Sequence, residues 1–251
     1  MICFRHFQPI ETSLSMNFLV IPIIFCAMFI QSLAGFGSAL IAMPFLIALL
    51  GPDIARPAFI LLGQSAGLMF MIEYRHDWKL SDIKYAVVGS LLGVPFGTWL
   101  ENAMSEDMFM LVLGIILIAY ATYALSGLTL PEMHSAWGSF FGICSGILHS
   151  AYNVGGPPLV MYHSTHEDWD ARRFKGNTQA IFFLMGFFVI YEHFRLGNIT
   201  TVVLQNYGLM LISTIIALSI GFRVEKFIKQ DIFRKIVMVL LMIIGLNLIV
   251  Y

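Results

Sequence analysis

Two short glycine-rich segments hold the residues whose types and spacing could do chemistry. The first is Ala34-Gly35-Phe36-Gly37-Ser38, and the second is Asn153-Val154-Gly155-Gly156-Pro157-Pro158. Glycine permits backbone turns that other residues avoid, and proline is tolerated in the first turn of a helix. Each segment therefore predicts a break in the chain followed by a new helix. The free N–H groups and the positive dipole of a helix start are suited to holding an anion.

Polar side chains flank both predicted breaks. A histidine has an unperturbed pKa of about 6.5, so His149 could supply positive charge or carry a proton. A neutral packing histidine is the alternative, and glycines also serve close helix packing. The predicted anion-binding residues of the two breaks and their flanks are Gln31, Ser32, Gly35, Gly37, Ser38, His149, Ser150, Asn153, Gly155, Gly156 and Pro157.

The elements that must position these residues are membrane helices. The chain is 59% hydrophobic and 12% charged, whereas a soluble domain is about 45–50% apolar and about 25% charged. Apolar blocks recur from Phe18 to Tyr251. We therefore predict an all-α polytopic membrane protein with the lipid bilayer as its surroundings. A net charge of −1 argues against nucleic acid as a partner.

Each half of the chain contains five apolar segments. The second segment of each half is short for a bilayer, which needs about 20 residues, and it follows a glycine break. We expect roughly 8–10 helical segments, with a glycine-broken pair, spanning or re-entrant, at the start of each half. The segments are Met16–Leu33, Ser38–Leu50, Ala55–Tyr74, Ile83–Leu100 and Met108–Leu125, then Ser135–Ala151, Leu159–His163, Asn177–Phe194, Thr200–Ile220 and Phe233–Tyr251.

The two halves align with each other as a duplication. The stretch from Gln31 to Ser38 falls on the stretch from His149 to Gly156, and Glu101 falls on Glu225 further along. The predicted organisation is a first transmembrane repeat over residues 1–125, a linker over 126–134 and a second repeat over 135–251.

Lysine and arginine alternate between corresponding loops of the two halves. Short loops rich in these residues stay cytoplasmic. Each loop that is poor in lysine and arginine corresponds to a rich loop in the other half. One poor loop holds Arg56, another holds Arg195, and Glu101–Asp107 holds neither lysine nor arginine. This pattern requires inverted repeats with both termini outside, and inverted repeats are typical of secondary transporters. The rich loops hold Arg75, Lys79 and Lys84; Arg172, Arg173 and Lys175; and Arg223, Lys226, Lys229, Arg234 and Lys235.

Other polar residues have simpler explanations. Hydrogen bonds between helices account for Gln64, Asn177 and Gln179. No phosphate loop, HExxH zinc pair or GxSxG elbow is present in the sequence, so we expect no catalytic residue, cofactor or metal site. One acidic and histidine-rich stretch could suggest a metal, but its neighbours Arg172 and Arg173 favour a solvated loop; it contains His163, His166, Glu167, Asp168 and Asp170.

The first break and its following helix resemble a known family. Gly35-Phe36-Gly37-Ser38-Ala39-Leu40-Ile41-Ala42-Met43-Pro44 is similar to the glycine-rich opening of the sulfite exporter TauE/SafE family, also called the 4-toluene sulfonate uptake permease family. Gly155-Gly156-Pro157 resembles the element of its second half. The resemblance implies a multi-pass permease of the plasma (inner) membrane for small organosulfur or related anions. Ser38, where the family often has glycine, and the polar run His149–Asn153 depart from the pattern and bear on the substrate.

A secondary transporter of small anions, and not an enzyme, is the favoured function. No ATP-binding element is visible, so we expect a proton or sodium gradient, or facilitated diffusion, to move a sulfite, a sulfonate or a carboxylate. Two alternatives stay open: an intramembrane enzyme using Ser150 or His149 on lipid or acyl substrates, and a non-enzymatic membrane assembly component. The sequence does not fix the substrate, the direction of transport or the oligomeric state.

Overall fold

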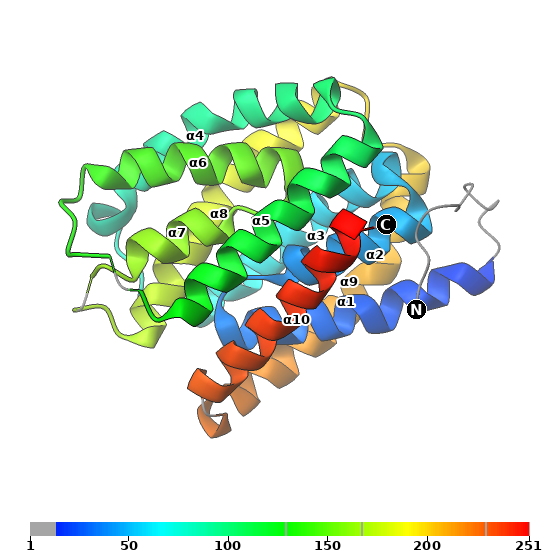
Figure 1. The fold of residues 1–251 in the computed structure, drawn as a ribbon. Helices are drawn as coiled ribbons and strands as arrows, with labels where there is room; N and C mark the ends of the chain where they lie inside the picture. The colour runs from blue at the N-terminus through cyan, green and yellow to red at the C-terminus, as the bar shows by residue number, and fades with distance from the viewer. Residues whose placement is uncertain (1–13, 129, 167, 229, 251) are drawn as a thin grey trace.

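The computed structural model describes residues 14–128, 130–166, 168–228 and 230–250. Within these residues the chain forms one bundle of ten α-helices and a short 3-10 helix, with no strand (Figure 1). In chain order they are α1 (Leu14–Ala34), α2 (Ser38–Leu50), α3 (Pro52–Glu73), α4 (Leu80–Ala103), α5 (Glu106–Ser126), α6 (Trp137–Tyr152), α7 (Gly156–His163), α8 (Ala171–Arg195), α9 (Thr201–Val224), η1 (Glu225–Phe227) and α10 (Gln230–Val250).

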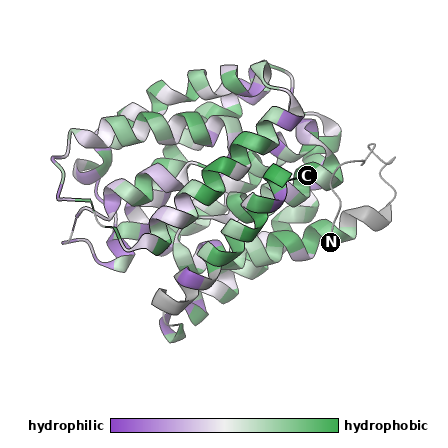
Figure 2. Ribbon diagram, viewed as in Figure 1, coloured by the Kyte–Doolittle hydropathy of each residue, from purple (hydrophilic) through white to green (hydrophobic). Residues whose placement is uncertain are grey.

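The all-helical prediction is confirmed, and each expected apolar segment corresponds to one helix. Helix α3 begins three residues earlier than Ala55 because Pro52 occupies its first turn, where the missing N–H is not needed. Four helices, α3, α4, α5 and α9, are long and apolar enough to cross a membrane. Figure 2 shows hydrophobic residues along the helices and hydrophilic ones gathered toward the helix ends and loops. Large exposed apolar side chains such as Leu92 and Phe96 then face lipid.

The helices pack in pairs that join the two halves of the chain. Helix α1 lies on α9, α4 on α6, α3 on α8 and α5 on α10. Helices α4 and α6 approach most closely, since glycines repeat at every fourth position on both helices. A Cβ atom at Gly93 of α4 or Gly146 of α6 would overlap a backbone carbonyl of the other helix. This small-residue packing fixes the path of α6, whose last turns carry His149.

The loops rich in lysine and arginine meet at one end of the bundle. Arg172 pairs with Asp77 at 3.0 Å, Arg173 pairs with Asp82 at 2.9 Å, and Lys175 reaches Glu225 at 2.7 Å. The start of α1 and the end of α10 lie together at the other end, on the right in Figure 1. The bundle thus has one cation-rich end and one end that carries both ends of the helical chain.

Candidate functional site

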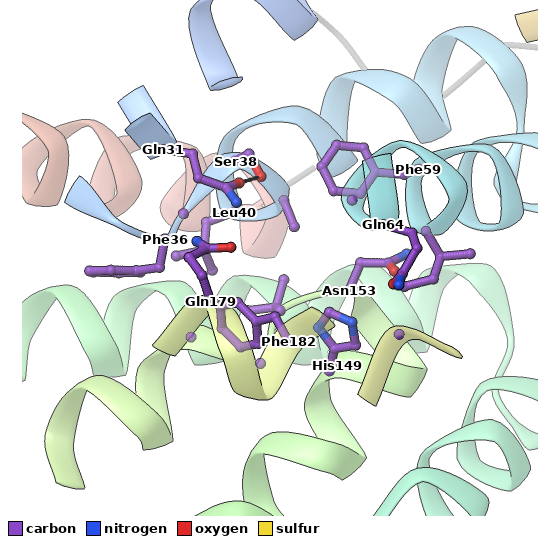
Figure 3. Close-up of a pocket in the computed structure, with 18 residues that line it drawn as sticks. Gln31, Phe36, Ser38, Leu40, Phe59, Gln64, His149, Asn153, Gln179 and Phe182 are labelled. Atoms are coloured by element: carbon purple, nitrogen blue, oxygen red, sulfur yellow. Dashed lines mark hydrogen bonds between the residues drawn. The ribbon is translucent and has the colours of Figure 1, made fainter. Parts of the chain in front are cut away.

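A cavity of about 50 Å³ lies between the two chain breaks and the middle of helices α3 and α8 (Figure 3). The first break contributes from α1 and α2, and the second from α6 and α7. Its lining residues are Gln31, Phe36, Gly37, Ser38, Ala39, Leu40, Phe59, Ile60, Gly63, Gln64, His149, Asn153, Val154, Gly155, Gly156, Gln179, Phe182 and Gly186.

The first break presents the start of α2 to the cavity. Helix α1 ends at Ala34, and Gly35 and Gly37 turn the chain with φ angles of 83° and 104°, which favour glycine. Gly37 is the N-cap and carries no side chain to cap the helix. The N–H groups of Ser38, Ala39 and Leu40 therefore have no partner within the helix, and these three residues line the cavity.

The second break is built differently. Helix α6 ends at Tyr152, and Asn153 follows with a φ of 57° while its N–H donates to the carbonyl of His149 at 2.8 Å. Helix α7 then begins at Gly156, but Pro157 and Pro158 have no N–H to offer. The two breaks touch: a Cβ at Gly156 would come within 2.9 Å of the ring of Phe36.

Several polar atoms at the cavity are buried without a hydrogen-bond partner among the described residues. They are both ring nitrogens of His149, Oδ1 of Asn153 and Oε1 of Gln64. The ring of His149 stacks on Phe182 with 5.4 Å between centroids, which holds its plane toward the cavity (Figure 3). Buried polar atoms normally have partners. A ligand that accepts a hydrogen bond would satisfy a protonated ring nitrogen of His149, whereas the two amide oxygens need a donor such as water.

Seven of the predicted residues line this cavity: Gln31, Gly37, Ser38, His149, Asn153, Gly155 and Gly156. Ser38 donates its hydroxyl to Oε1 of Gln31, so the first break fixes its own polar side chains. Gln64 and Gln179 also line the cavity. Gln64 makes the expected bond between helices, to the carbonyl of Phe183 at 3.2 Å. Gln179 instead donates to the carbonyl of Gly35 in the first break, at 2.5 Å.

The structure does not bring the other four predicted residues to the cavity. Ser32 donates to the carbonyl of Phe29 at 2.6 Å, and Ser150 pairs with Thr98 at 2.6 Å. Each serine follows a cavity residue directly, and one step along a helix rotates the side chain by about 100°. Gly35 packs on the side chain of Lys175. Pro157 is buried in the first turn of α7.

The solvated-loop interpretation was wrong for His163. It ends α7, is 1% exposed, and its Nδ1 bonds to the hydroxyl of Thr178 at 2.8 Å. The approach of α8 covers it, which the sequence pattern did not indicate. Among the described residues no cluster of His, Cys, Asp and Glu could hold a metal ion. Glu167 lies outside the described residues.

Sequence reasoning missed the apolar walls of the cavity. Phe36, Phe59 and Phe182 narrow it, but in a chain that is 14% aromatic nothing marks these three rings. The middle of α3 was missed too, where Gly63 leaves open space beside Gln64. The available signal was a glutamine within each of the two apolar helices, Gln64 in α3 and Gln179 in α8.

One comparison with known proteins identifies the family of the chain. A family model, sulfite exporter TauE/SafE, matches residues 20–248. The chain belongs to the TauE/SafE sulfite exporter family. It is therefore a membrane transporter, and the apolar helices agree with this. No curated protein and no solved structure matches the chain.

Proposed function

We propose that this TauE/SafE protein is a secondary transporter of a small oxyanion such as sulfite, in the plasma membrane. One observation carries the proposal. The free N–H donors at the start of α2 and the unpartnered nitrogens of His149 meet in one buried cavity. A helix start and a histidine both favour negative charge. No acidic side chain is among the lining residues.

The size of the cavity favours a small substrate. Its volume of about 50 Å³ is room for roughly four water molecules. Sulfite, with one sulfur and three oxygens, has about that bulk. An aryl sulfonate adds a whole ring, which would have to fit beside the rings of Phe36, Phe59 and Phe182 that line the cavity.

The transport mechanism that fits is alternating access between two inverted halves, residues 1–125 and 135–251 joined by 126–134. The helix pairs support such symmetry. Suppose that α1 to α5 correspond in order to α6 to α10. Exchanging the two halves then turns the contact of α1 with α9 into the contact of α6 with α4, and it leaves the contact of α3 with α8 unchanged. The proposed orientation puts the lysine- and arginine-rich end in the cytoplasm and both termini outside. A proton or sodium ion is the proposed coupling ion.

Binding would proceed through the chain's own donors. The N–H groups of Ser38, Ala39 and Leu40 hold the oxyanion from one side. His149 holds it from the other, with the second N–H of the Asn153 amide, whose first N–H donates to the carbonyl of Arg56. The enzyme alternative has less support. The ring nitrogens of His149 have no partner and Ser150 pairs with Thr98, so no activated Ser–His pair is present in the described residues.

Solute flux in proteoliposomes tests the proposal. Purified protein would be reconstituted and offered labelled sulfite, methanesulfonate or 4-toluenesulfonate, with protein-free liposomes as the control. We expect protein-dependent flux of the first two and little of the third. Absence of flux for every small oxyanion, or flux of the aryl sulfonate alone, would contradict the proposal.

A further inference from the structure

Two buried ion pairs occupy corresponding places in the two halves of the chain. Nη1 of Arg56 lies 3.4 Å from Glu101, with the side chains 12% and 9% exposed. Nζ of Lys175 lies 2.7 Å from Glu225, with the side chains 4% and 18% exposed. In each pair the cation stands near the start of the third helix of its half, and the glutamate stands at the end of the fourth. Glu101 and Glu225 are also the glutamates that align in the duplication.

Each pair touches the chain break of the other half. The backbone carbonyl of Arg56 accepts from Nδ2 of Asn153 at 3.4 Å. Nζ of Lys175 lies 3.4 Å from the carbonyl of Ser32, and its side chain fills the space beside Gly35, where a Cβ would meet Cγ at 2.7 Å. The Lys175 side chain therefore contacts the first break directly, while Arg56 is joined to the second break through its backbone.

The two cations also stand at opposite ends of the cavity wall. On α3, Arg56 begins a face that continues through Ile60 and Gln64 at helical spacing, and on α8 Lys175 begins one that continues through Gln179. Gln64 of α3 lies beside Gly186 of α8, and Gly67, further along α3, lies beside Phe183, which comes earlier in α8. The two helices are therefore antiparallel. Arg56 is eight residues from Gln64, roughly 12 Å along the axis.

The guanidinium of Arg56 is not fully used by Glu101, and Glu225 does not depend on Lys175 alone. Nε of Arg56 is buried and has no partner among the described residues, while the guanidinium lies 3.8 Å from the ring centroid of Phe109. The hydroxyl of Tyr74 also donates a hydrogen bond to Glu225, at 2.9 Å. This bond would keep the carboxylate in place if Lys175 moved away from it. Burial and the Glu225 carboxylate raise the pKa of Tyr74, so the phenol stays protonated and able to donate.

We propose that Arg56 and Lys175 are two further anion sites, one at each end of the transport path, each closed by its glutamate until an oxyanion takes the glutamate's place. This rests on the proposed function, because it requires an anion that moves through the cavity. The anion reaches one cation, exchanges with Glu101 or Glu225, and frees the adjoining break to open on that face only. Guanidinium and ammonium groups are suited to this exchange because carboxylates and oxyanions compete for the same donors.

Face-specific labelling tests the gates. The background carries Ser in place of Cys3, Cys26 and Cys144, with Gly63→Cys as the reporter, since Gly63 lines the cavity with open space around its Cα. A membrane-impermeant thiol reagent is added to right-side-out or inside-out vesicles. Glu101→Gln should speed labelling severalfold from the Arg56 face alone, and Glu225→Gln from the Lys175 face alone. Glu192→Gln, which breaks the exposed pair with Arg195, is the control and should change neither rate.

A second readout separates anion sites from structural ion pairs. Both Arg56→Gln and Glu101→Gln break the pair, so a purely structural role predicts the same loss of sulfite binding from each. If Arg56 binds the anion, calorimetry should show about tenfold weaker sulfite binding in Arg56→Gln and equal or tighter binding in Glu101→Gln. The double variant Arg56→Gln with Glu101→Gln removes both charges of the pair. It therefore leaves no unpaired buried charge that could prevent folding.

The outcomes are distinct. Equal changes of labelling from both faces, or equal effects of Arg56→Gln and Glu101→Gln on binding, would overturn this inference. Wild-type protein without flux of any small oxyanion would instead overturn the proposed function, since face-specific labelling does not depend on flux.

Discussion

The two chain breaks that bound the cavity differ in what they offer an anion. The first offers backbone: Gly35 and Gly37 at positive φ leave the N–H groups of Ser38, Ala39 and Leu40 free at the cavity. The second offers side chains, because Pro157 and Pro158 remove the donors that a helix start would otherwise present. His149 and Asn153 stand there instead.

This difference teaches that the two halves need not contribute the same chemistry to one site. The backbone donors of α2 cannot change their charge, whereas an imidazole can gain or lose a proton. A transporter built on this plan would have a constant anion-binding half and a half whose strength depends on pH.

Replacing Gly37 should remove the backbone half of the site. Gly37→Ala forces a residue with a Cβ into a left-handed conformation, at a cost of about 1–2 kcal/mol. We expect transport to fall by more than tenfold because the start of α2 moves. Gly127→Ala is the matched control, since Gly127 has a φ of 70°, open space around it and no place at the cavity. Thermal unfolding should shift similarly in both variants, so a similar loss of flux in both would show that stability alone is involved.

Replacing His149 should remove the pH dependence of the side-chain half. With methanesulfonate, which keeps one charge between pH 5 and pH 8, wild-type binding should tighten severalfold as pH falls, because a protonated imidazole attracts the anion. His149→Gln keeps a polar group and matches Gln31 of the other half. It should flatten the profile without changing the fold. A folded variant with an unchanged profile, measured by calorimetry, would remove His149 from the site.

Asn153 permits its amide to be separated from its turn. Asn153→Gly keeps the φ of 57° without strain and loses only the side chain. We expect anion affinity to fall about threefold to tenfold, the range for one hydrogen bond, with a loss of stability limited to the bond from Nδ2 of Asn153 to the carbonyl of Arg56. Asn153→Ala should lose the same affinity and about 1 kcal/mol of stability as well. Equal binding by wild type and Asn153→Gly would leave the amide with no role in binding.

Pro157→Ala should have the smallest effect. The substitution restores one N–H to the start of α7 and makes it more like the start of α2. Pro157 does not line the cavity, so the new donor should change affinity by less than about twofold. Tenfold tighter binding would mean that α7 does reach the anion and that its prolines limit the site.

The sequence by itself determined the bundle and the place of the breaks. With 12% charged residues, the chain has too few charged side chains to cover the surface of a soluble globular protein. Apolar runs then predicted roughly 8–10 helical segments, and the described residues form ten α-helices. Gly35 and Gly37 favour a turn with positive φ, and Pro157 and Pro158 favour the first turn of a helix. These are local effects, set by the few bonds on either side of each residue.

Only the tertiary structure decided which polar residues meet. Ser32 and Ser150 have the right chemistry and position along the chain, but their place on the helix turns them to Phe29 and Thr98. Arg56 and Lys175 read as loop cations in the sequence and are buried against glutamates 45 or more residues away. Which face of a helix is covered depends on its neighbours, and apolar sequence on every side carries no signal of that choice.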